Sequence, residues 1–196
     1  MILWARSEGM FMKRLAEIGA VVLPYSIILC VAILRLATDY PQNFIPIFTC
    51  ILVFAALRPM RELPIPILFL IGIDALLTTH RYGHSLTADH AVTWSWYLSV
   101  ALLGGKLLRQ SSSIRQGVGA TVLAAVTFFV ASNFVVWTLW GMYPRSWSGL
   151  AQCYIAALPF FRNSLISETV CSVGIFSIMK FAVLRIYPER IQDSSY

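Results

Sequence analysis

All three histidines of the chain, His80, His84 and His90, lie within one short stretch. A neutral imidazole nitrogen is the commonest protein ligand for transition metals. The spacing from His80 to His84 would place both rings on one helical face, but Gly83 disfavours a continuous helix there. A closed zinc site needs three or four ligands, and Asp89 is the one further candidate nearby. The alternative is a polar loop whose histidines contact water and lipid headgroups. His80, at the end of an apolar segment, is the strongest candidate ligand.

Asp74 lies inside an apolar segment, where a carboxylate is costly and is usually paired. Arg81 follows seven residues later, on the same helical face, with Thr78 between them. We therefore expect an Asp74–Arg81 ion pair or a polar pocket wall, with a proton relay as the alternative. His80 lies on a different face, so Asp74 is not its expected partner.

Aromatic residues gather at the ends of three apolar segments: Trp94, Trp96 and Tyr97; Trp137, Trp140 and Tyr143; and Tyr154, Phe160 and Phe161. A belt at the membrane–water boundary would explain several of them. It does not explain Asn133, four residues before Trp137, or Asn43 next to Phe44. Amides among aromatic rings favour a pocket for a large amphipathic ligand.

The elements that must position these residues are membrane-spanning helices. Of the 196 residues, 58% are hydrophobic and 12% are charged, about half the charged share of a soluble domain. We predict an all-α fold in a single domain, 1–196, a polytopic membrane protein with six transmembrane helices. The expected spans are 15–36, 45–57, 63–79, 91–108, 116–139 and 163–186, the last beginning at an N-cap near Asn163 and Ser164.

The charges predict the orientation. The net charge is +6, but Lys and Arg lie at the ends of apolar segments rather than along one stripe, which excludes a nucleic-acid partner. With the N-terminus inside, the outer side keeps Arg35, Arg81, Arg145 and Arg162, and every other Lys and Arg is inside. Both termini are then cytoplasmic. The outer connections, about 37–44, 80–90 and 140–163, hold all the histidines.

Other chemistry finds no support in the sequence. The four cysteines lie in or beside apolar segments without metal-like spacing, and we interpret them as packing residues. The chain has no glycine-rich phosphate loop, no nucleophile elbow and no HExxH motif.

A distinctive set of motifs remains: Asn43-Phe44-Ile45-Pro46, Ser132-Asn133-Phe134, Trp137, Met142-Tyr143-Pro144, Gly149-Leu150, Cys153-Tyr154 and Ala156-Ala157-Leu158-Pro159-Phe160-Phe161-Arg162-Asn163. Together they resemble a family of small bacterial transport proteins whose best-understood branch is the BtuM-type cobalamin transporters. That branch is similar to the S components of energy-coupling factor (ECF) vitamin transporters. The resemblance covers about Asn43 to Glu168.

The resemblance implies an ECF S-component-like bundle in the bacterial inner membrane. It also implies uptake of cobalamin or cobinamide as the bound substrate from the periplasmic side. The family pattern has a cysteine as axial ligand to the corrin cobalt, and His80 occupies that place here. Imidazole lacks thiolate reactivity, so we expect binding with the nucleotide base displaced rather than enzymatic removal of cyanide. The expected pocket residues are Tyr82, His84, Trp94, Asn133, Trp137, Tyr143 and Phe161.

The resemblance also bears on partners. ECF S components use small residues on the first helix to dock onto a coupling subunit, and Ala16 and Ala20 fit that pattern loosely. BtuM-type members are thought to work without a dedicated ATPase module, so the protein could also act alone.

Three alternatives stay open. The first is an S component for another vitamin or for a cobalt or nickel ion, in which the three histidines act together. The second is a membrane enzyme that modifies a corrinoid or a lipid-linked substrate. The third is a structural subunit without a ligand, whose outer aromatic residues form only a belt.

Overall fold

The computed structural model describes residues 19, 21–36, 43–109 and 113–186, and the side chains of these up to residue 181. Over these residues the fold is all-helical, as predicted, without a strand. The helices are Val21–Leu36, α2 (Ile47–Leu57), α3 (Pro64–Leu76), α4 (Ala88–Leu108), α5 (Ile114–Leu139) and α6 (Trp147–Ile186). Two short turns, η1 (Met60–Glu62) and the π-helical η2 (Leu77–Arg81), flank α3. The residues Ala16 and Ala20 of the predicted docking pair lie outside the described part.

Among the described residues, three helical segments are long and apolar enough to cross a membrane: Met60–Arg81, Ile114–Leu139 and Trp147–Phe181. The apolar helices Val21–Leu36 and Ile47–Leu57 are shorter. The chain therefore has helices suited to a membrane protein. The prediction of six spans includes three more than these, and it stays a prediction.

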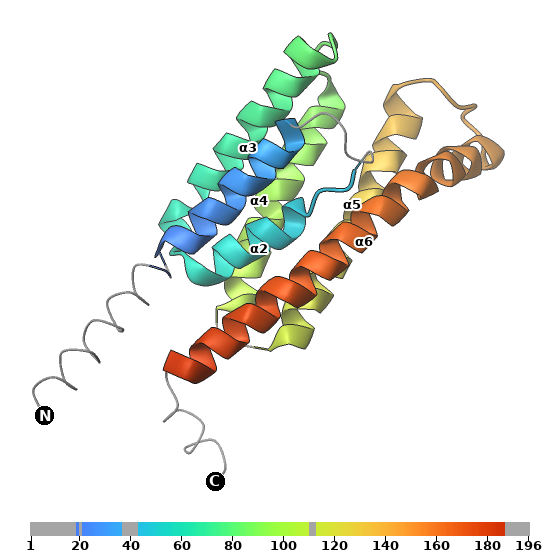
Figure 1. Ribbon diagram of the computed structural model, residues 1–196. Coiled ribbons are helices and arrows are strands. Elements are labelled where there is room, and N and C mark those ends of the chain that lie inside the picture. The colour runs from blue at the N-terminus through green and yellow to red at the C-terminus, as the bar shows by residue number, and fades with distance from the viewer. Residues whose placement is uncertain (1–18, 20, 37–42, 110–112, 187–196) are drawn as a thin grey trace, which may run out of the picture.

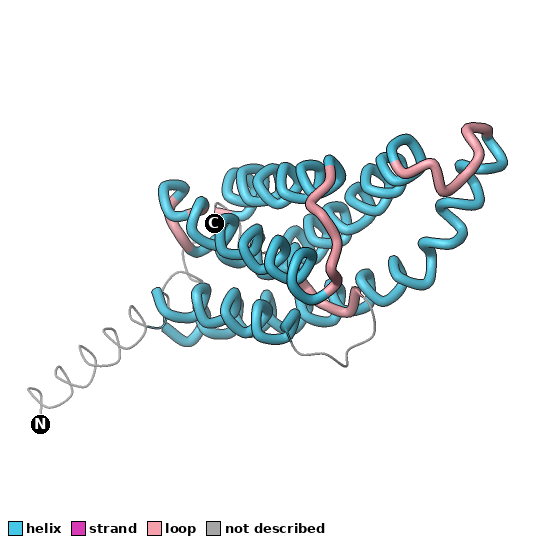
Figure 2. Tube along the Cα trace, turned by 90° about the horizontal axis from the view of Figure 1, so that it is seen from above, coloured by secondary structure: helices cyan, strands magenta, loops and turns pink. Residues whose placement is uncertain are grey.

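The helices lie side by side and alternate in direction (Figures 1 and 2). The connections α2–α3 and α4–α5 meet at one end, which we call the basic end. The connections η2–α4 and α5–α6 lie at the opposite end, which we call the cavity end. Figure 1 shows that α5 and α6 form a hairpin whose upper part leans away from α3 and α4. The helices therefore diverge toward the cavity end.

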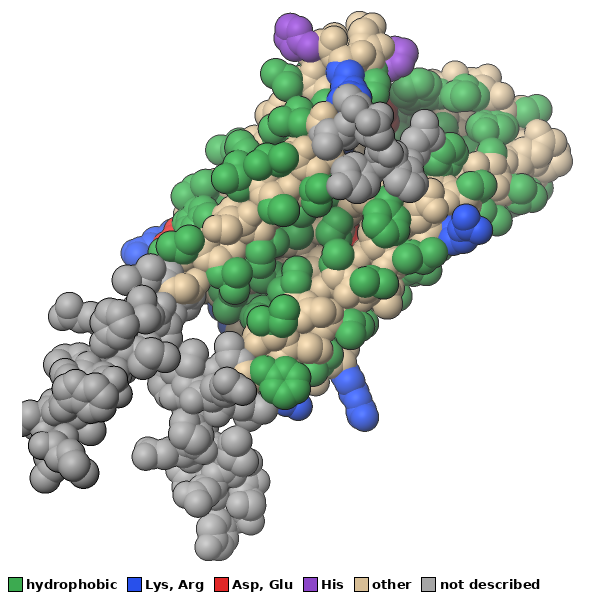
Figure 3. Space-filling view, viewed as in Figure 1, with side chains coloured by type: hydrophobic (Ala, Val, Ile, Leu, Met, Phe, Trp, Pro, Cys, Tyr) green, Lys and Arg blue, Asp and Glu red, His purple; other side chains and the backbone are tan. Residues whose placement is uncertain are grey.

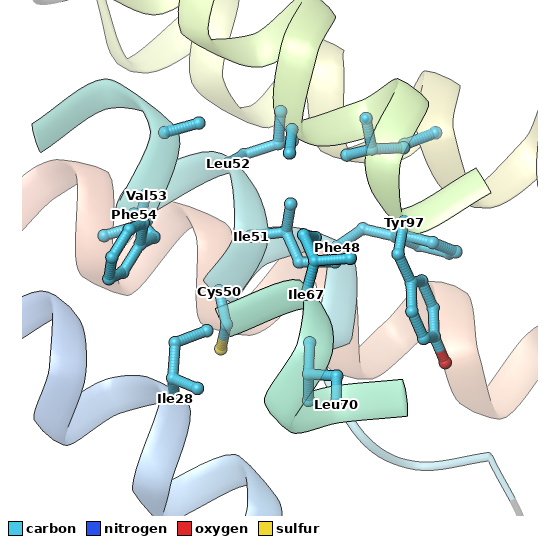
Figure 4. Packing of buried hydrophobic residues seen from close by; sticks show 14 of the residues in the cluster. Ile28, Phe48, Cys50, Ile51, Leu52, Val53, Phe54, Ile67, Leu70 and Tyr97 are labelled. Carbon is cyan, nitrogen blue, oxygen red and sulfur yellow. The ribbon is translucent and has the colours of Figure 1, made fainter. Parts of the chain in front are cut away.

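Helix α2 forms the centre of the core (Figure 4). Every residue from Phe48 to Ala55 is buried, since α2 is apolar on all sides and contacts α4, α5 and α6. Helix α4 approaches it closely through Gly104, where a Cβ would lie 2.3 Å from the Leu52 side chain. Figure 1 shows α2 confined to the lower half of the bundle. The space above the first turn of α2 is thus enclosed by the other helices.

Helix α6 begins much earlier than predicted. It starts at Trp147 and runs for 40 residues, so that Asn163 and Ser164 lie in its middle and do not cap it. At about 1.5 Å per residue it is about 60 Å long, twice a hydrocarbon core. Pro159 lies inside it, and a proline there removes one backbone hydrogen bond without ending the helix. The sequence prediction treated this proline and the polar residues after it as a loop.

Candidate functional site

A cavity of about 780 Å³ lies above α2 at the cavity end of the bundle. Ligand pockets in proteins commonly enclose about 300–1,000 Å³, so this cavity has the size of a binding site. All six helices contribute to its wall, which combines aromatic rings with charged and amide groups. The polar part of the lining consists of Arg35, Asn43, Asp74, Arg81, Asp89, His90, Thr93, Ser132, Asn133, Ser164 and Glu168.

An ion pair forms one wall of the cavity. The Arg35 guanidinium lies 2.6 Å from a carboxylate oxygen of Asp74, and both side chains are largely buried. The second oxygen of Asp74 accepts a hydrogen bond of 3.0 Å from the Trp94 indole N–H. Arg35 also donates to the Tyr97 hydroxyl at 3.4 Å. Four side chains from three helices therefore hold one another in a fixed polar cluster.

The predicted pairing of Asp74 with Arg81 was wrong, whereas the alternative expectation, that Asp74 forms part of a polar pocket wall, is confirmed. Asp74 pairs with Arg35, and Arg81 instead donates to the Leu36 carbonyl at 2.8 Å. The cause is the π-helical turn η2 (Leu77–Arg81), because its wider winding shifts Arg81 off the face that a regular α-helix would give it. The Leu36 carbonyl is at the end of its helix, where a cation is favourable.

Glu168 forms the floor of the cavity and is 1% exposed. Its carboxylate accepts hydrogen bonds from the backbone N–H groups of Phe48 and Thr49, each 2.8 Å long. The Thr49 hydroxyl donates to the same carboxylate at 2.6 Å. These two N–H groups belong to the first turn of α2, and the N-cap residue Pro46 gives no side-chain cap. Glu168 of the neighbouring helix α6 therefore caps α2.

His90 is the one histidine that lines the cavity. Its Nδ1 accepts a hydrogen bond of 3.2 Å from the backbone N–H of Thr87, as part of a capping box at the start of α4. Its Nε2 lies 3.1 Å from the Thr78 hydroxyl, and because Nδ1 is an acceptor, Nε2 carries the proton and donates. One ring nitrogen of His90 thus caps its own helix α4, and the other holds η2 against α4.

The other two histidines lie at the rim. His80, in η2, and His84, in the following connection, are exposed and are not among the residues that line the cavity. Histidine side chains are seen at the cavity end of the molecule in Figure 3. In the part of the chain that the structure describes, no three His, Cys, Asp or Glu side chains are placed to hold a metal ion. The role of His80 as a cobalt ligand stays a prediction.

The remaining pocket candidates fall into two groups. Tyr82, Asn133 and Phe161 line the cavity, and Phe161 stacks on Phe129 with ring centroids 4.3 Å apart. Trp94 does not line the cavity itself but donates a hydrogen bond to the lining residue Asp74. In contrast, Trp137 donates to the Pro144 carbonyl at 2.9 Å. Trp137 and Tyr143 thus lie at the α5–α6 connection, and neither lines the cavity.

The match to known proteins is to one family. Residues 17–190 match the model of a family of unknown function, DUF6580. The chain belongs to this family. No curated protein and no solved structure matches the chain.

Sequence reasoning missed two of the charged cavity residues in this DUF6580 chain, Arg35 and Glu168, and also the aromatic Phe128 and Phe129. Glu168 carried a usable signal, because it is an acidic residue within an apolar segment, and such residues need a partner. The identity of that partner, the first turn of α2, had no signal in the sequence. Arg35 was assigned to the outer boundary by the charge pattern, which says nothing of the helix that it faces.

Proposed function

We propose that this protein is a membrane-embedded substrate-binding protein for uptake, and that its substrate is a corrinoid such as cobalamin or cobinamide. The observation that carries the proposal is the cavity of about 780 Å³ at one end of a bundle of apolar helices. A cavity that combines aromatic faces with a few fixed polar groups suits a ligand that is partly apolar and partly amide-rich.

The charge distribution supports an orientation with the cavity on the outer side. Arg58, Arg61, Lys106 and Arg109 lie at or near the basic end, where α2 and α4 finish, and Lys180 lies toward it near the end of α6. Because basic residues remain on the cytoplasmic side, this end is the inner one in our proposal. The chain then crosses the bacterial inner membrane six times, and the short α2 is one of the crossings.

The proposed contacts follow from the lining. The rings of Phe128, Phe129 and Phe161 offer apolar faces to the corrin, and Asn133 offers an amide for its side-chain amides. His80 stands at the rim, one residue before the cavity-lining Arg81, and binds the cobalt of a corrin ring seated in the mouth. A coupling module in the membrane is the proposed partner for the transport step, which the protein otherwise performs alone.

The test is a visible absorption spectrum of the purified protein with cobinamide and with cyanocobalamin. We expect a bound corrinoid whose band shifts on binding, and the shift should disappear in His80→Ala. The matched control is His84→Ala, which removes an exposed imidazole of the same rim and should leave the shift intact. If all three proteins bound the corrinoid with the same spectrum, His80 would not be the cobalt ligand. If none of the three proteins bound a corrinoid, the proposal that the substrate is a corrinoid would be overturned.

One observation favours a second candidate, uptake of a smaller polar vitamin. In the described part of the chain, five charged side chains line the cavity, namely Arg35, Asp74, Arg81, Asp89 and Glu168. Such a wall would suit a ligand that carries its own charge. A thermal-shift panel of water-soluble vitamins separates the candidates, since each ligand raises the melting temperature only where it binds the folded state.

A further inference from the structure

Arg162 occupies an unusual position on the outside of the bundle. It lies within the candidate span Trp147–Phe181, and its side chain is exposed. No acidic group or carbonyl in the described part of the chain pairs with it. An arginine within an apolar span is costly and normally pairs with an anion or reaches the headgroup region. The partner of this guanidinium must therefore come from outside the described chain.

An apolar groove of about 560 Å³ lies beside Arg162 on α6. Among the described residues its lining consists of Ile155, Leu158, Pro159, Phe161, Arg162 and Leu165, and the guanidinium is the one charged group in that set. Pro159 cannot donate a backbone hydrogen bond, which leaves the Ile155 carbonyl without its helical partner. Figure 3 shows an isolated basic group at the edge of the molecule over α6, with hydrophobic side chains on the adjoining surface.

The position along α6 matches the boundary of a membrane. Lys180 is the next basic residue of α6 after Arg162, eighteen residues further on. At about 1.5 Å per residue the two cations are about 27 Å apart, close to the thickness of a hydrocarbon core of about 30 Å. Arg162 therefore lies at the level of lipid phosphates, whichever side of the membrane this end faces.

We propose that the Arg162 groove is a binding site for an anionic phospholipid of the adjoining leaflet. The guanidinium pairs with the phosphate through two parallel N–H donors, a geometry that arginine provides and lysine does not. The acyl chains run past Leu165 toward the middle of the membrane, and Leu158, on the other side of Arg162, packs against the glycerol and headgroup. This site is separate from the central cavity, and the proposal does not depend on the corrinoid.

The test is native mass spectrometry of the full-length protein in detergent with added phosphatidylglycerol or phosphatidylcholine of the same acyl chains. We expect the wild type to retain phosphatidylglycerol over phosphatidylcholine, and Arg162→Gln to lower that preference about fivefold. The matched control is Lys180→Gln, which removes one exposed cation from the other end of α6 and, because lysine lacks the two parallel donors of arginine, should lower the preference by much less than Arg162→Gln does. Equal preferences in Arg162→Gln and in the wild type would overturn the proposal, as would a wild type without any preference.

A second variant tests the apolar half of the site. Leu158 is 50% exposed, so Leu158→Trp can fill the groove without disturbing the core. We expect it to lower retention of both lipids while Arg162 stays in place. Unchanged retention of phosphatidylglycerol in Leu158→Trp would show that the lipid does not use the groove. This variant keeps the test informative if Arg162→Gln does not fold.

Discussion

Replacement of Glu168 by alanine should be among the most damaging single substitutions in the chain. The carboxylate is 1% exposed and accepts bonds from two backbone N–H groups and one hydroxyl at the start of α2. Glu168→Ala would leave the N–H groups of Phe48 and Thr49 buried without an acceptor. The Thr49 hydroxyl would keep one, because it also donates to the Glu168 backbone carbonyl at 3.1 Å.

The expected loss follows from those two N–H groups. Each buried donor left unsatisfied costs about 1–3 kcal/mol, so the free energy of unfolding should fall by about 2–6 kcal/mol. In a protein of this size each kcal/mol lowers the melting temperature by about 2–4 °C, which gives a fall of roughly 10 °C near the middle of the range. Glu168→Gln keeps one oxygen acceptor and should lose about half as much.

The assay is thermal unfolding of the purified protein in detergent, followed by intrinsic tryptophan fluorescence. The matched control is Ser167→Ala, since Ser167 is equally buried but bonds only within α6, to the Ser164 carbonyl. It should melt within about 2 °C of the wild type. If Glu168→Ala has the same melting temperature as Ser167→Ala, the carboxylate does not hold α2, and the reasoning about the cavity floor is refuted.

Two further pairs of variants test the packing by the same melting assay. Trp94→Phe loses the bond to the Asp74 carboxylate and should cost about 1.5–3 kcal/mol, whereas Trp96→Phe removes a buried N–H without a partner and should cost less than 1 kcal/mol; equal losses would contradict the polar cluster. Gly117→Ala would place a Cβ 2.6 Å from the Phe176 ring and should destabilise by about 1–3 kcal/mol. Gly119→Ala, two residues further along α5 in open space, should stabilise the protein by about 0.5–1 kcal/mol. If both alanine variants changed the stability in the same direction, the described packing of α5 against Phe176 would be contradicted.

The helices could largely be predicted from hydropathy, because each long apolar segment must bury its backbone polar groups in a helix. The predicted segments 91–108 and 116–139 are within three residues of α4 and α5. The prediction failed at the start of α6, because Pro159 and the polar residues 162–164 resemble the end of a loop although the helix runs through them. A proline can lie inside a long helix, so its presence does not locate a helix boundary.

The site was predictable only in part, for a related reason. Periodicity places residues on the faces of one helix, and the sequence therefore found Asp74 as a buried charge in need of a partner. The choice between Arg35 and Arg81 depended on a π-helical turn and on the packing of a distant helix. Neither leaves a mark in local sequence. Tyr82, Asn133 and Phe161 line the cavity, as their residue types at a bundle mouth suggested, but Trp137 and Tyr143, chosen on the same ground, do not, so residue type alone is an incomplete guide.

The cavity holds its strongest charges in fixed partnerships before any ligand arrives. Asp74 is held by Arg35 and Trp94, and Glu168 is held by the first turn of α2. A ligand that displaced either carboxylate would leave a buried group unpaired, at a cost that its own contacts must exceed. A ligand can therefore gain affinity from groups that it can contact without breaking such a partnership. The rim residue Tyr82, which is 59% exposed, is an example. Selectivity should thus reside at the rim and in the aromatic wall, while the ion pair and the α2 cap set the shape that a ligand must fit.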